Sequence, residues 1–214
     1  MKNKSIWQII AISGALSAVV YLAHVILGGL LWPGYSHIQQ MISDLTGDGA
    51  PDAAMLRVFT TVYGILACIF AVSLLMSFRA LKVRRAARIG AVLLIIMEVS
   101  SLVGYGLFPL SESAEMNVQN IGHIVVTAVV VLTTETCGFI IAAGLLKTEG
   151  FRKLGVFMLV CSCVMVGAGL MTPVTMATGW PIGGLVERLN ILTLQLWILV
   201  LSVSVFRKRL PAAE

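Results

Sequence analysis

Residues 6–32 of the chain, IWQIIAISGALSAVVYLAHVILGGLLW, form the stretch that decides the fold class. A helix needs about 20 apolar residues to cross the roughly 30 Å of hydrocarbon in a bilayer, and this run is longer than that. A cleaved signal peptide is the competing interpretation, but its apolar region would be only about 7–15 residues long. The run therefore predicts an uncleaved first transmembrane span.

Five further apolar runs of similar length follow along the 214 residues. The chain is 58% hydrophobic and 12% charged, whereas a soluble domain has roughly 25% charged residues. The predicted spans cover about 6–32, 54–78, 89–108, 121–146, 154–172 and 185–206. Backbone groups inside lipid must bond within their own segment, so the spans are expected to be helices. The sequence predicts an all-α integral membrane protein, a bundle of six transmembrane helices that forms one domain over residues 1–214.

Proline positions agree with these limits. Five of the six prolines fall at predicted span ends or in connections, where helices can stop: Pro33, Pro51, Pro109, Pro173 and Pro181. We therefore expect no proline inside a span.

Lysine and arginine gather in alternate connections. The basic residues on one side are Lys2, Lys4, Arg79, Lys82, Arg84, Arg85, Arg88, Lys147, Arg152, Lys153, Arg207, Lys208 and Arg209, which is 13 of the 15. The other side carries Asp44, Asp48, Asp52, Glu112 and Glu115. By the positive-inside rule, both termini are predicted to be cytoplasmic, in a multi-pass protein of the cell membrane. The net charge of +5 thus indicates topology and no nucleic-acid partner.

The connection after the first span includes residues 35–46, YSHIQQMISDLT. Ser36 and Gln39 have the spacing of a capping box, which favours a helix start, and Gly47 is well placed to end that helix. One apolar face recurs at helical spacing: Ile38, Met41, Ile42 and Leu45. We expect a short amphipathic helix that lies on the outer interface and covers the outer mouth of the bundle.

Ionisable side chains at the outer ends of four predicted spans are candidate ligand-binding residues. They are His24, Arg57, His123, Glu187 and Arg188, and the connection adds Ser43 and Asp44. The arginines would meet phosphate or carboxylate, and the other groups would orient them. The hypothesis is an outward-facing polar pocket for a membrane lipid headgroup or a small amphiphile. The alternative is that these are scattered interfacial charges that face water, and that the polar stripes on the helices are packing seams.

Two carboxylates are predicted to lie deep in the membrane. Glu98 and Glu135 would sit at similar depths, about 14 Å and 17 Å from the cytoplasmic ends of consecutive spans. One interpretation is a proton or cation relay, which would make the protein a proton-coupled transporter. The other is a protonated glutamate that hydrogen-bonds a threonine or serine across the bundle.

Cofactor and metal motifs are not evident, and we expect none to be bound. The cysteines Cys68, Cys137, Cys161 and Cys163 all fall in apolar runs, without zinc or redox spacing, and are expected to be buried free thiols. Ser43 lacks the glycines of a nucleophile elbow. A metal-dependent membrane hydrolase acting on lipid amides or esters is the enzymatic alternative. It would need Asp44 and at least two of the three histidines, His24, His37 and His123.

Three segments together resemble a known family. They are SHIQQMISDL at 36–45, GLFPLSESAEMNVQNIGH at 106–123 and GLVERL at 184–189. Their order and topology are similar to those of prokaryotic multi-pass membrane proteins grouped as domain of unknown function 998. The resemblance points to Ser43, Asp44, Phe108, Pro109, His123, Glu187 and Arg188. It implies the architecture and the location of a site, and it implies no activity.

Overall fold

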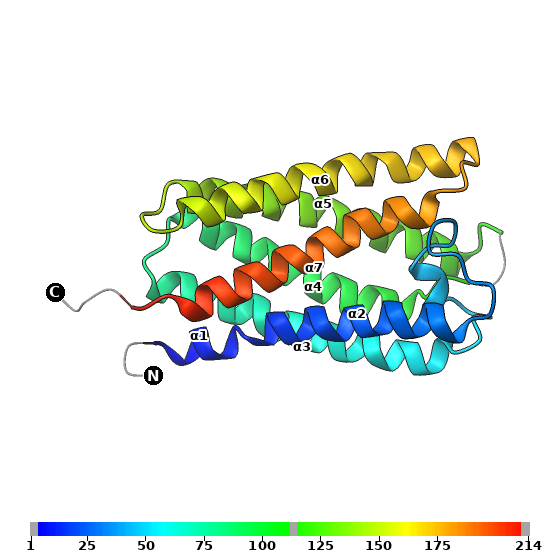
Figure 1. Cartoon of the computed structure of the whole chain (residues 1–214), viewed down its shortest axis with the longest axis horizontal. Helices are drawn as coiled ribbons and strands as arrows, with labels where there is room; N and C mark the ends of the chain where they lie inside the picture. The colour runs from blue at the N-terminus through cyan, green and yellow to red at the C-terminus, as the bar shows by residue number, and fades with distance from the viewer. Residues whose placement is uncertain (1–3, 112–114, 211–214) are drawn as a thin grey trace.

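The computed structural model describes residues 4–111 and 115–210, and every regular element in those residues is helical (Figure 1). The helices are α1 (Ile6–Ile10), α2 (Ser13–Leu31), α3 (Ala53–Ala80), α4 (Arg85–Leu107), α5 (Val118–Leu146), α6 (Arg152–Thr178) and α7 (Gly183–Arg207), with a short 3-10 helix η1 (Ser43–Thr46). With α1 and α2 taken as one span, six helices are long and apolar enough to cross a membrane. The predicted all-α, six-span architecture is confirmed.

The six spans form an elongated ring. Each helix packs beside its neighbour in the sequence, from α2 through α3, α4, α5 and α6 to α7, and α7 returns to α2 (Figure 1). The Gln8 side chain of α1 joins the two ends of the chain, because it donates to the carbonyls of Val205 at 3.0 Å and Lys208 at 2.9 Å. The first and last spans are therefore neighbours that bond directly to each other.

A break between α1 and α2 interrupts the first span, and a side chain from α7 fills it. The Ser202 hydroxyl donates to the carbonyl of Ala11 at 2.7 Å and accepts from the N–H of Ala15 at 3.1 Å. In an unbroken helix these two backbone groups would bond to each other. Insertion of a side chain into the helical ladder is a recognised cause of a kink, and it explains why the uninterrupted run 6–32 does not give one helix.

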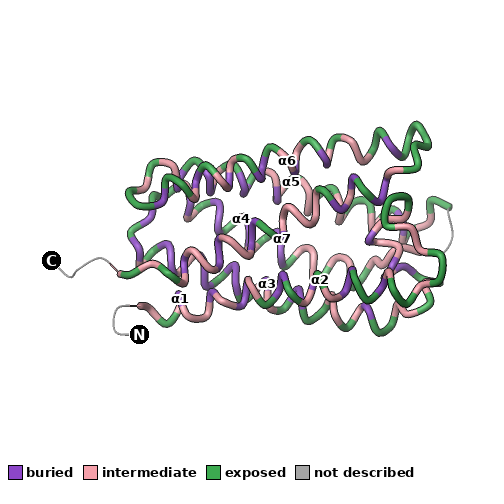
Figure 2. The backbone as a smooth tube through the Cα atoms, viewed as in Figure 1, coloured by how far each residue is buried: buried purple, intermediate pink, exposed green. Residues whose placement is uncertain are grey.

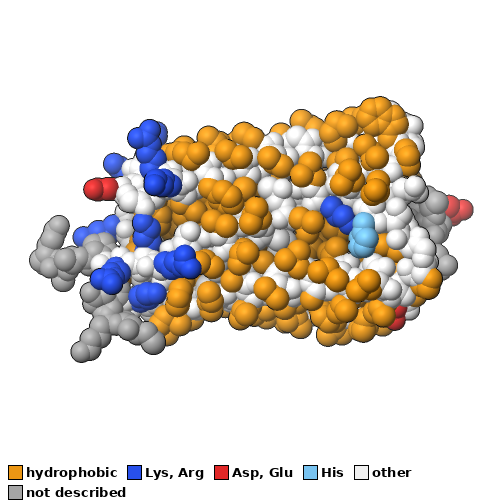
Figure 3. All heavy atoms as spheres, in the orientation of Figure 1, with side chains coloured by type: hydrophobic (Ala, Val, Ile, Leu, Met, Phe, Trp, Pro, Cys, Tyr) orange, Lys and Arg blue, Asp and Glu red, His pale blue; other side chains and the backbone are white. Residues whose placement is uncertain are grey.

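The two ends of the ring differ in charge. We call the end with residues 4 and 210 and the connections 81–84 and 147–151 the basic end, and the end with segments 32–52, 108–111, 115–117 and 179–182 the capped end. Lysine and arginine side chains gather at one end of the molecule in Figure 3. Of the residues expected there, Lys2 lies outside the described residues, as Glu112 does among those expected at the opposite end. The cytoplasmic placement of the basic end stays a prediction from this charge pattern.

Packing differs along the ring as well. The larger core cluster lies in the basic half and contains Phe70, Leu74, Leu94, Met97, Trp197 and Ile198, each at most 1% exposed. The smaller cluster, in the capped half, centres on Tyr21, Leu45 and Tyr63. Along 121–133 of α5 no residue is buried, and Figure 2 shows the buried positions concentrated towards the basic end. The basic half is therefore closely packed and the capped half is looser.

Helix α6 departs from its predicted limits. The expectation of a span at 154–172 that stops before Pro173 is wrong, because Pro173 lies inside α6 and the helix continues to Thr178. A proline costs a helix one N–H donor, here the one that would bond to the carbonyl of Gly169. Membrane helices tolerate this loss when neighbouring groups compensate. The nearby hydroxyls of Thr172 and Thr175 bond to the carbonyls of Ala168 and Thr172, and not to that of Gly169.

Candidate functional site

The connection between α2 and α3 does not fold as the single amphipathic helix expected over 36–47. One bond of the predicted capping box is present, since the Ser36 hydroxyl accepts from the N–H of Gln39 at 3.3 Å, but the N–H of Ser36 donates to Gln40 Oε1 at 2.8 Å and not to Gln39. Residues 37–39 form a single turn and no helix, and only η1 follows, over Ser43–Thr46. The helix that was expected to begin at Ser36 does not form.

The backbone of this loop bonds to α7 as well as to itself. The N–H groups of Gly184 and Leu185 donate to the carbonyls of Gln39 at 3.2 Å and Ile38 at 2.9 Å. The first N–H groups of a helix have no partner within that helix, so the loop carbonyls satisfy donors of α7. Gly184 permits the approach, because a Cβ there would overlap the carbonyl group of Gln40.

Two adjacent residues of α7 complete this attachment. The Glu187 carboxylate accepts from the N–H of Ile42 and is also hydrogen-bonded by Ser43. The Arg188 guanidinium donates from Nη1 to the carbonyl of Gln40 at 2.7 Å and to that of Gly184 at 3.0 Å. From Nη2 it donates to the hydroxyl of Tyr35 at 2.7 Å. We call Tyr35, Ser43, Glu187 and Arg188 the loop clamp. Three of the predicted ligand residues thus hold the loop against α7.

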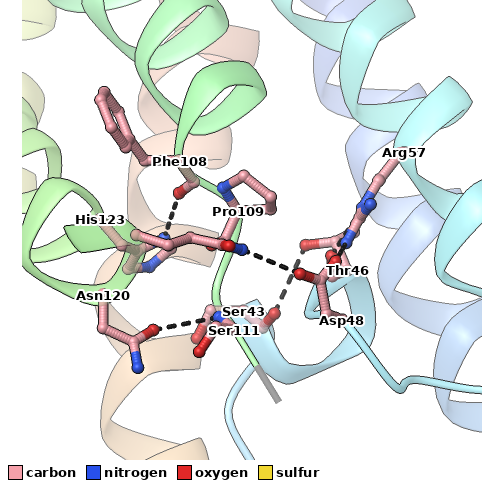
Figure 4. Close-up of polar contacts among 10 residues, drawn as sticks. Ser43, Thr46, Asp48, Arg57, Phe108, Pro109, Ser111, Asn120 and His123 are labelled. Atoms are coloured by element: carbon pink, nitrogen blue, oxygen red, sulfur yellow. Dashed lines mark hydrogen bonds and ion pairs between the residues drawn. The ribbon is translucent and has the colours of Figure 1, made fainter. Parts of the chain in front are cut away.

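A second polar cluster connects the same loop to α3 and α5. Arg57 donates from Nη2 to Asp48 Oδ1 at 2.6 Å and from Nε to the carbonyl of Thr46 at 2.9 Å (Figure 4). Gln119 donates to Asp48 Oδ2 at 2.9 Å and to the carbonyl of Pro109 at 2.8 Å. Asp48 is therefore the point at which three separate segments meet.

His123 of α5 lies beside this second polar cluster. Its Nδ1 lies 2.9 Å from the carbonyl of Phe108, and its ring packs beside that of Tyr105, with 5.1 Å between the centroids. The side chain of Asn120, one turn earlier, accepts from the N–H of Ser111 at 3.0 Å (Figure 4). His123 thus holds the segment that follows α4, and it takes no part in the loop clamp.

A hollow of about 270 Å³ opens between the two capped-end segments. It is lined by Trp32, Asp44, Gly47, Asp48, Gly49, Ala50, Leu110 and Ser111. Asp44 is the one residue of the predicted ligand set that lines it, and Arg57 reaches it through Asp48. The ionisable lining consists of two carboxylates, and the aromatic lining is one indole.

The two carboxylates in this hollow titrate in different ranges. Burial raises the pKa of Asp44 above its ordinary value, although the N–H of Met41, 2.8 Å from Oδ2, and the charge of Arg188 oppose the rise. The pKa of Asp48 is lowered, first by its hydrogen bond from Arg57 and then by that from Gln119. Asp48 therefore stays ionised at a lower pH than Asp44 does.

The two deep carboxylates have unlike surroundings. Glu98 is fully buried, and neither of its carboxylate oxygens has a hydrogen-bond partner among the described residues. Glu135 is half-buried and is hydrogen-bonded by Asn190 of α7, which also donates to the carbonyl of Met165 at 2.7 Å. The expected threonine or serine partner is therefore wrong for both residues, and the two carboxylates are not bonded to each other.

The described residues do not bring together a set of metal ligands. In the part of the chain that the structure describes, no group of three or more His, Cys, Asp or Glu side chains is placed to hold a metal ion. All four cysteines are free, with Cys137 and Cys161 buried, Cys68 half-buried and Cys163 exposed, so burial was predicted correctly for two of them. The metal-dependent hydrolase remains a sequence hypothesis that the geometry does not favour.

Several residues of the polar contacts at the capped end could not be identified from the sequence. Trp32 and Tyr35 lie outside the quoted family-like segments, although a tryptophan at the end of an apolar run is typical of a membrane interface, and Gln119 lies inside segment 106–123 without being singled out. Gln119 and Tyr35 act through contacts with distant segments, which leave no spacing signal in the sequence.

Comparison with known proteins identifies the family. The family model described as "Protein of unknown function (DUF998)" matches residues 15–204, so the chain belongs to this family. No curated protein and no solved structure matched the chain.

Proposed function

We propose that this member of the DUF998 family binds the cationic headgroup of an amphiphile in the hollow at the capped end. The observation that carries the proposal is the lining of that hollow, in which Asp44 and Asp48 lie with the indole of Trp32. Carboxylates combined with an aromatic face are the usual means by which proteins hold ammonium groups. The proposal takes the capped end to be the outer side, as the lysine and arginine distribution predicts.

The charges at the hollow favour a headgroup with both signs. Arg57 neutralises Asp48 in part, whereas Asp44 has no ion-pair partner among the described residues. Asp44 is then the carboxylate available to an ammonium group. Arg57, with its side chain 39% exposed beside Asp48, is placed to meet a phosphate.

The dimensions and the position of the hollow suit a headgroup better than a whole lipid. Its volume of about 270 Å³ is slightly below the roughly 300–1,000 Å³ of sites that enclose drug-sized ligands. Trp32 follows directly on Leu30 and Leu31, which are 75% and 46% exposed at the end of α2. Acyl chains that run along this apolar surface would bring a headgroup to the indole.

The predicted ligand residues acquire separate roles in this proposal. Asp44 contacts the headgroup, and Arg57 positions Asp48. Arg188, Glu187 and Ser43 act at a distance, because they hold the loop that carries Asp44.

Binding of short-chain lipids to the purified protein tests the proposal. Titration calorimetry would compare dihexanoyl phosphocholine with dihexanoyl phosphoglycerol, which has no ammonium group. Asp44→Asn is expected to weaken phosphocholine binding about tenfold or more, since a charged contact contributes roughly 1.5–3 kcal/mol.

The matched control is Asp52→Asn, because Asp52 lies on the same connection and does not line the hollow. It should bind as the wild type does. Equal binding of the two lipids, or unchanged binding in Asp44→Asn, would reject the proposal.

A further inference from the structure

Glu98 is the least expected side chain in the interior of the ring. It lies in the middle of α4, is 0% exposed, and has no hydrogen-bond partner among the described residues for either carboxylate oxygen. An ionised carboxylate in such surroundings, without a counterion, is much less stable than a neutral one. We propose that Glu98 is a proton-binding site that exchanges its proton with the solution at the capped end. This inference does not depend on the headgroup site.

The groups that face Glu98 offer no positive charge. Tyr63 and Cys68 act on it from α3, and Cys137 acts on it from α5. The next ionisable group is Glu135, two residues before Cys137 in α5, and it also lies near that thiol. All four are neutral or acidic. Charge balance at Glu98 therefore requires a proton or another small cation from outside the protein.

Helix α7 supplies an uncharged contact near the same place. The Gln195 side chain donates from Nε2 to the hydroxyl of Tyr63 at 3.2 Å, while its Oε1 is buried without a partner among the described residues. A protonated Glu98 is a donor, and the Oε1 of Gln195 is an acceptor without a partner among the described residues. The polar groups around Glu98 thus suit the neutral acid better than the anion.

A series of hydroxyl-bearing rings leads from Glu98 towards the capped end. Tyr63 packs edge-on against Tyr21 of α2, with 4.8 Å between the ring centroids. Tyr21 in turn lies near Glu187 and Arg188 of the loop clamp and near Tyr105 of α4. Phenol and carboxyl groups can both donate and accept protons. Fewer positions are buried in the capped half of the ring than in the basic half, as Figure 2 shows.

The way towards the basic end is closed by apolar side chains. In α4 itself, Leu94 and Met97 lie on that side of Glu98 and are 0% and 1% exposed. Phe70 and Leu74 of α3 and Trp197 of α7 pack in the same core cluster, and each is at most 1% exposed. Packing of this density leaves no room for a file of water. Proton exchange is therefore expected from one side only.

Dicyclohexylcarbodiimide labelling of the wild-type protein tests the inference. This apolar reagent takes the proton of a neutral carboxyl group onto its nitrogen and bonds the carboxylate oxygen to its central carbon. The adduct rearranges to a stable N-acylurea, and no atom leaves. The protein would be labelled in sealed vesicles and digested, and the modified residues would be identified by mass spectrometry. Met116→Cys, which is exposed at the capped end, reports the orientation through an impermeant maleimide.

Outer and inner pH are then varied separately in vesicles whose capped ends face outwards. Labelling of Glu98 should fall by about tenfold per pH unit once the outer pH exceeds its pKa, as for any single acid. A change of the inner pH alone should leave it unchanged. Labelling that follows the inner pH, that ignores both pH values, or that never reaches Glu98 would overturn the proposal.

Two glutamine variants serve as controls. Glu98→Gln should lose the label, and Glu135→Gln should keep it on Glu98, because Glu135 is a half-buried carboxylate with its own partner in Asn190. If Glu98→Gln does not fold, the site-resolved labelling of the wild type still decides. Loss of the Glu98 label in Glu135→Gln would show that the two carboxyls form one coupled site, contrary to the proposal.

Discussion

The guanidinium of Arg188 donates to the backbone carbonyl of Gln40 at 2.7 Å, across 148 positions of the chain. A side chain of the last helix thus holds the first connection of the capped end. Arg188 is 7% exposed, and both of its terminal nitrogens are engaged by the protein. It is therefore a structural arginine that shapes the candidate site without lining it.

Replacement of Arg188 should destabilise the protein. Arg188→Lys cannot serve the two carbonyls and the Tyr35 hydroxyl together, because an ammonium group lacks the planar fork of a guanidinium. We expect a loss of about 1–3 kcal/mol, the usual cost of leaving buried polar groups unpaired. Thermal unfolding in detergent micelles, followed by circular dichroism, measures it. Arg209→Ala, an exposed change at the basic end, is the control, and a lysine variant as stable as the wild type would contradict the assignment.

A methyl group at Gly184 should separate the loop from α7. A Cβ at this position would overlap the carbonyl group of Gln40, which is backbone and cannot rotate away. Gly184→Ala is expected to cost about 1–3 kcal/mol, as overpacked sites do. Gly167→Ala is the matched control in a neighbouring helix, since a Cβ there meets nothing within 4 Å. Equal unfolding temperatures for the two variants would show that the loop adapts.

Headgroup binding should depend on pH through Asp44. Burial raises the pKa of Asp44, so acidification from neutral pH removes its charge before that of Asp48, whose pKa is lowered by Arg57. Affinity for dihexanoyl phosphocholine should therefore fall as the pH passes down through the raised Asp44 range.

Calorimetric titrations at successive pH values measure this dependence. In Asp44→Asn the affinity should be lower and should stay constant over the same range, with a decline only where Asp48 begins to protonate. Identical pH profiles for the wild type and for Asp44→Asn would show that another group controls binding.

The charge pattern predicts which end of the ring faces the cytoplasm. A green fluorescent protein fused after Leu210 should fluoresce in cells, and an alkaline phosphatase fused at the same point should be inactive. The reverse results are expected for fusions within the connection 179–182 at the capped end, between α6 and α7. Activity of the phosphatase after Leu210 would invert the predicted orientation.

The architecture could be predicted from the sequence because length and apolarity are sufficient to require membrane helices. The predicted runs end within a few residues of the observed helices at most positions. The exception with a clear cause is Pro173, which was taken as a stop signal and lies within α6. The break at Ala11 and Ile12 was also not predictable, because it depends on Ser202 of a distant helix.

The candidate site could be located only in part. The ionisable residues at one level indicated the capped end, and the structure places Ser43, Glu187 and Arg188 together there. Their roles were not evident, because the loop carbonyls of Ile38 and Gln39 bond to α7 and do not continue a helix within the loop. A capping-box spacing such as that at Ser36 indicates where a helix can begin. It does not indicate whether the carbonyls that follow will accept hydrogen bonds within that helix or from another segment.

Ring closure by α7 has a consequence for biogenesis. The bonds of Gln8, the gap filled by Ser202 and the loop held by Arg188 all depend on α7, which is synthesised after the five other described spans. Until α7 inserts, the Ala11 carbonyl of the first span lacks its bond from Ser202. The carbonyls of Ile38 and Gln39 in the first connection likewise lack their bonds from α7. The last helix therefore completes the first one, and a chain that stops short of α7 would expose these groups as a signal for membrane quality control.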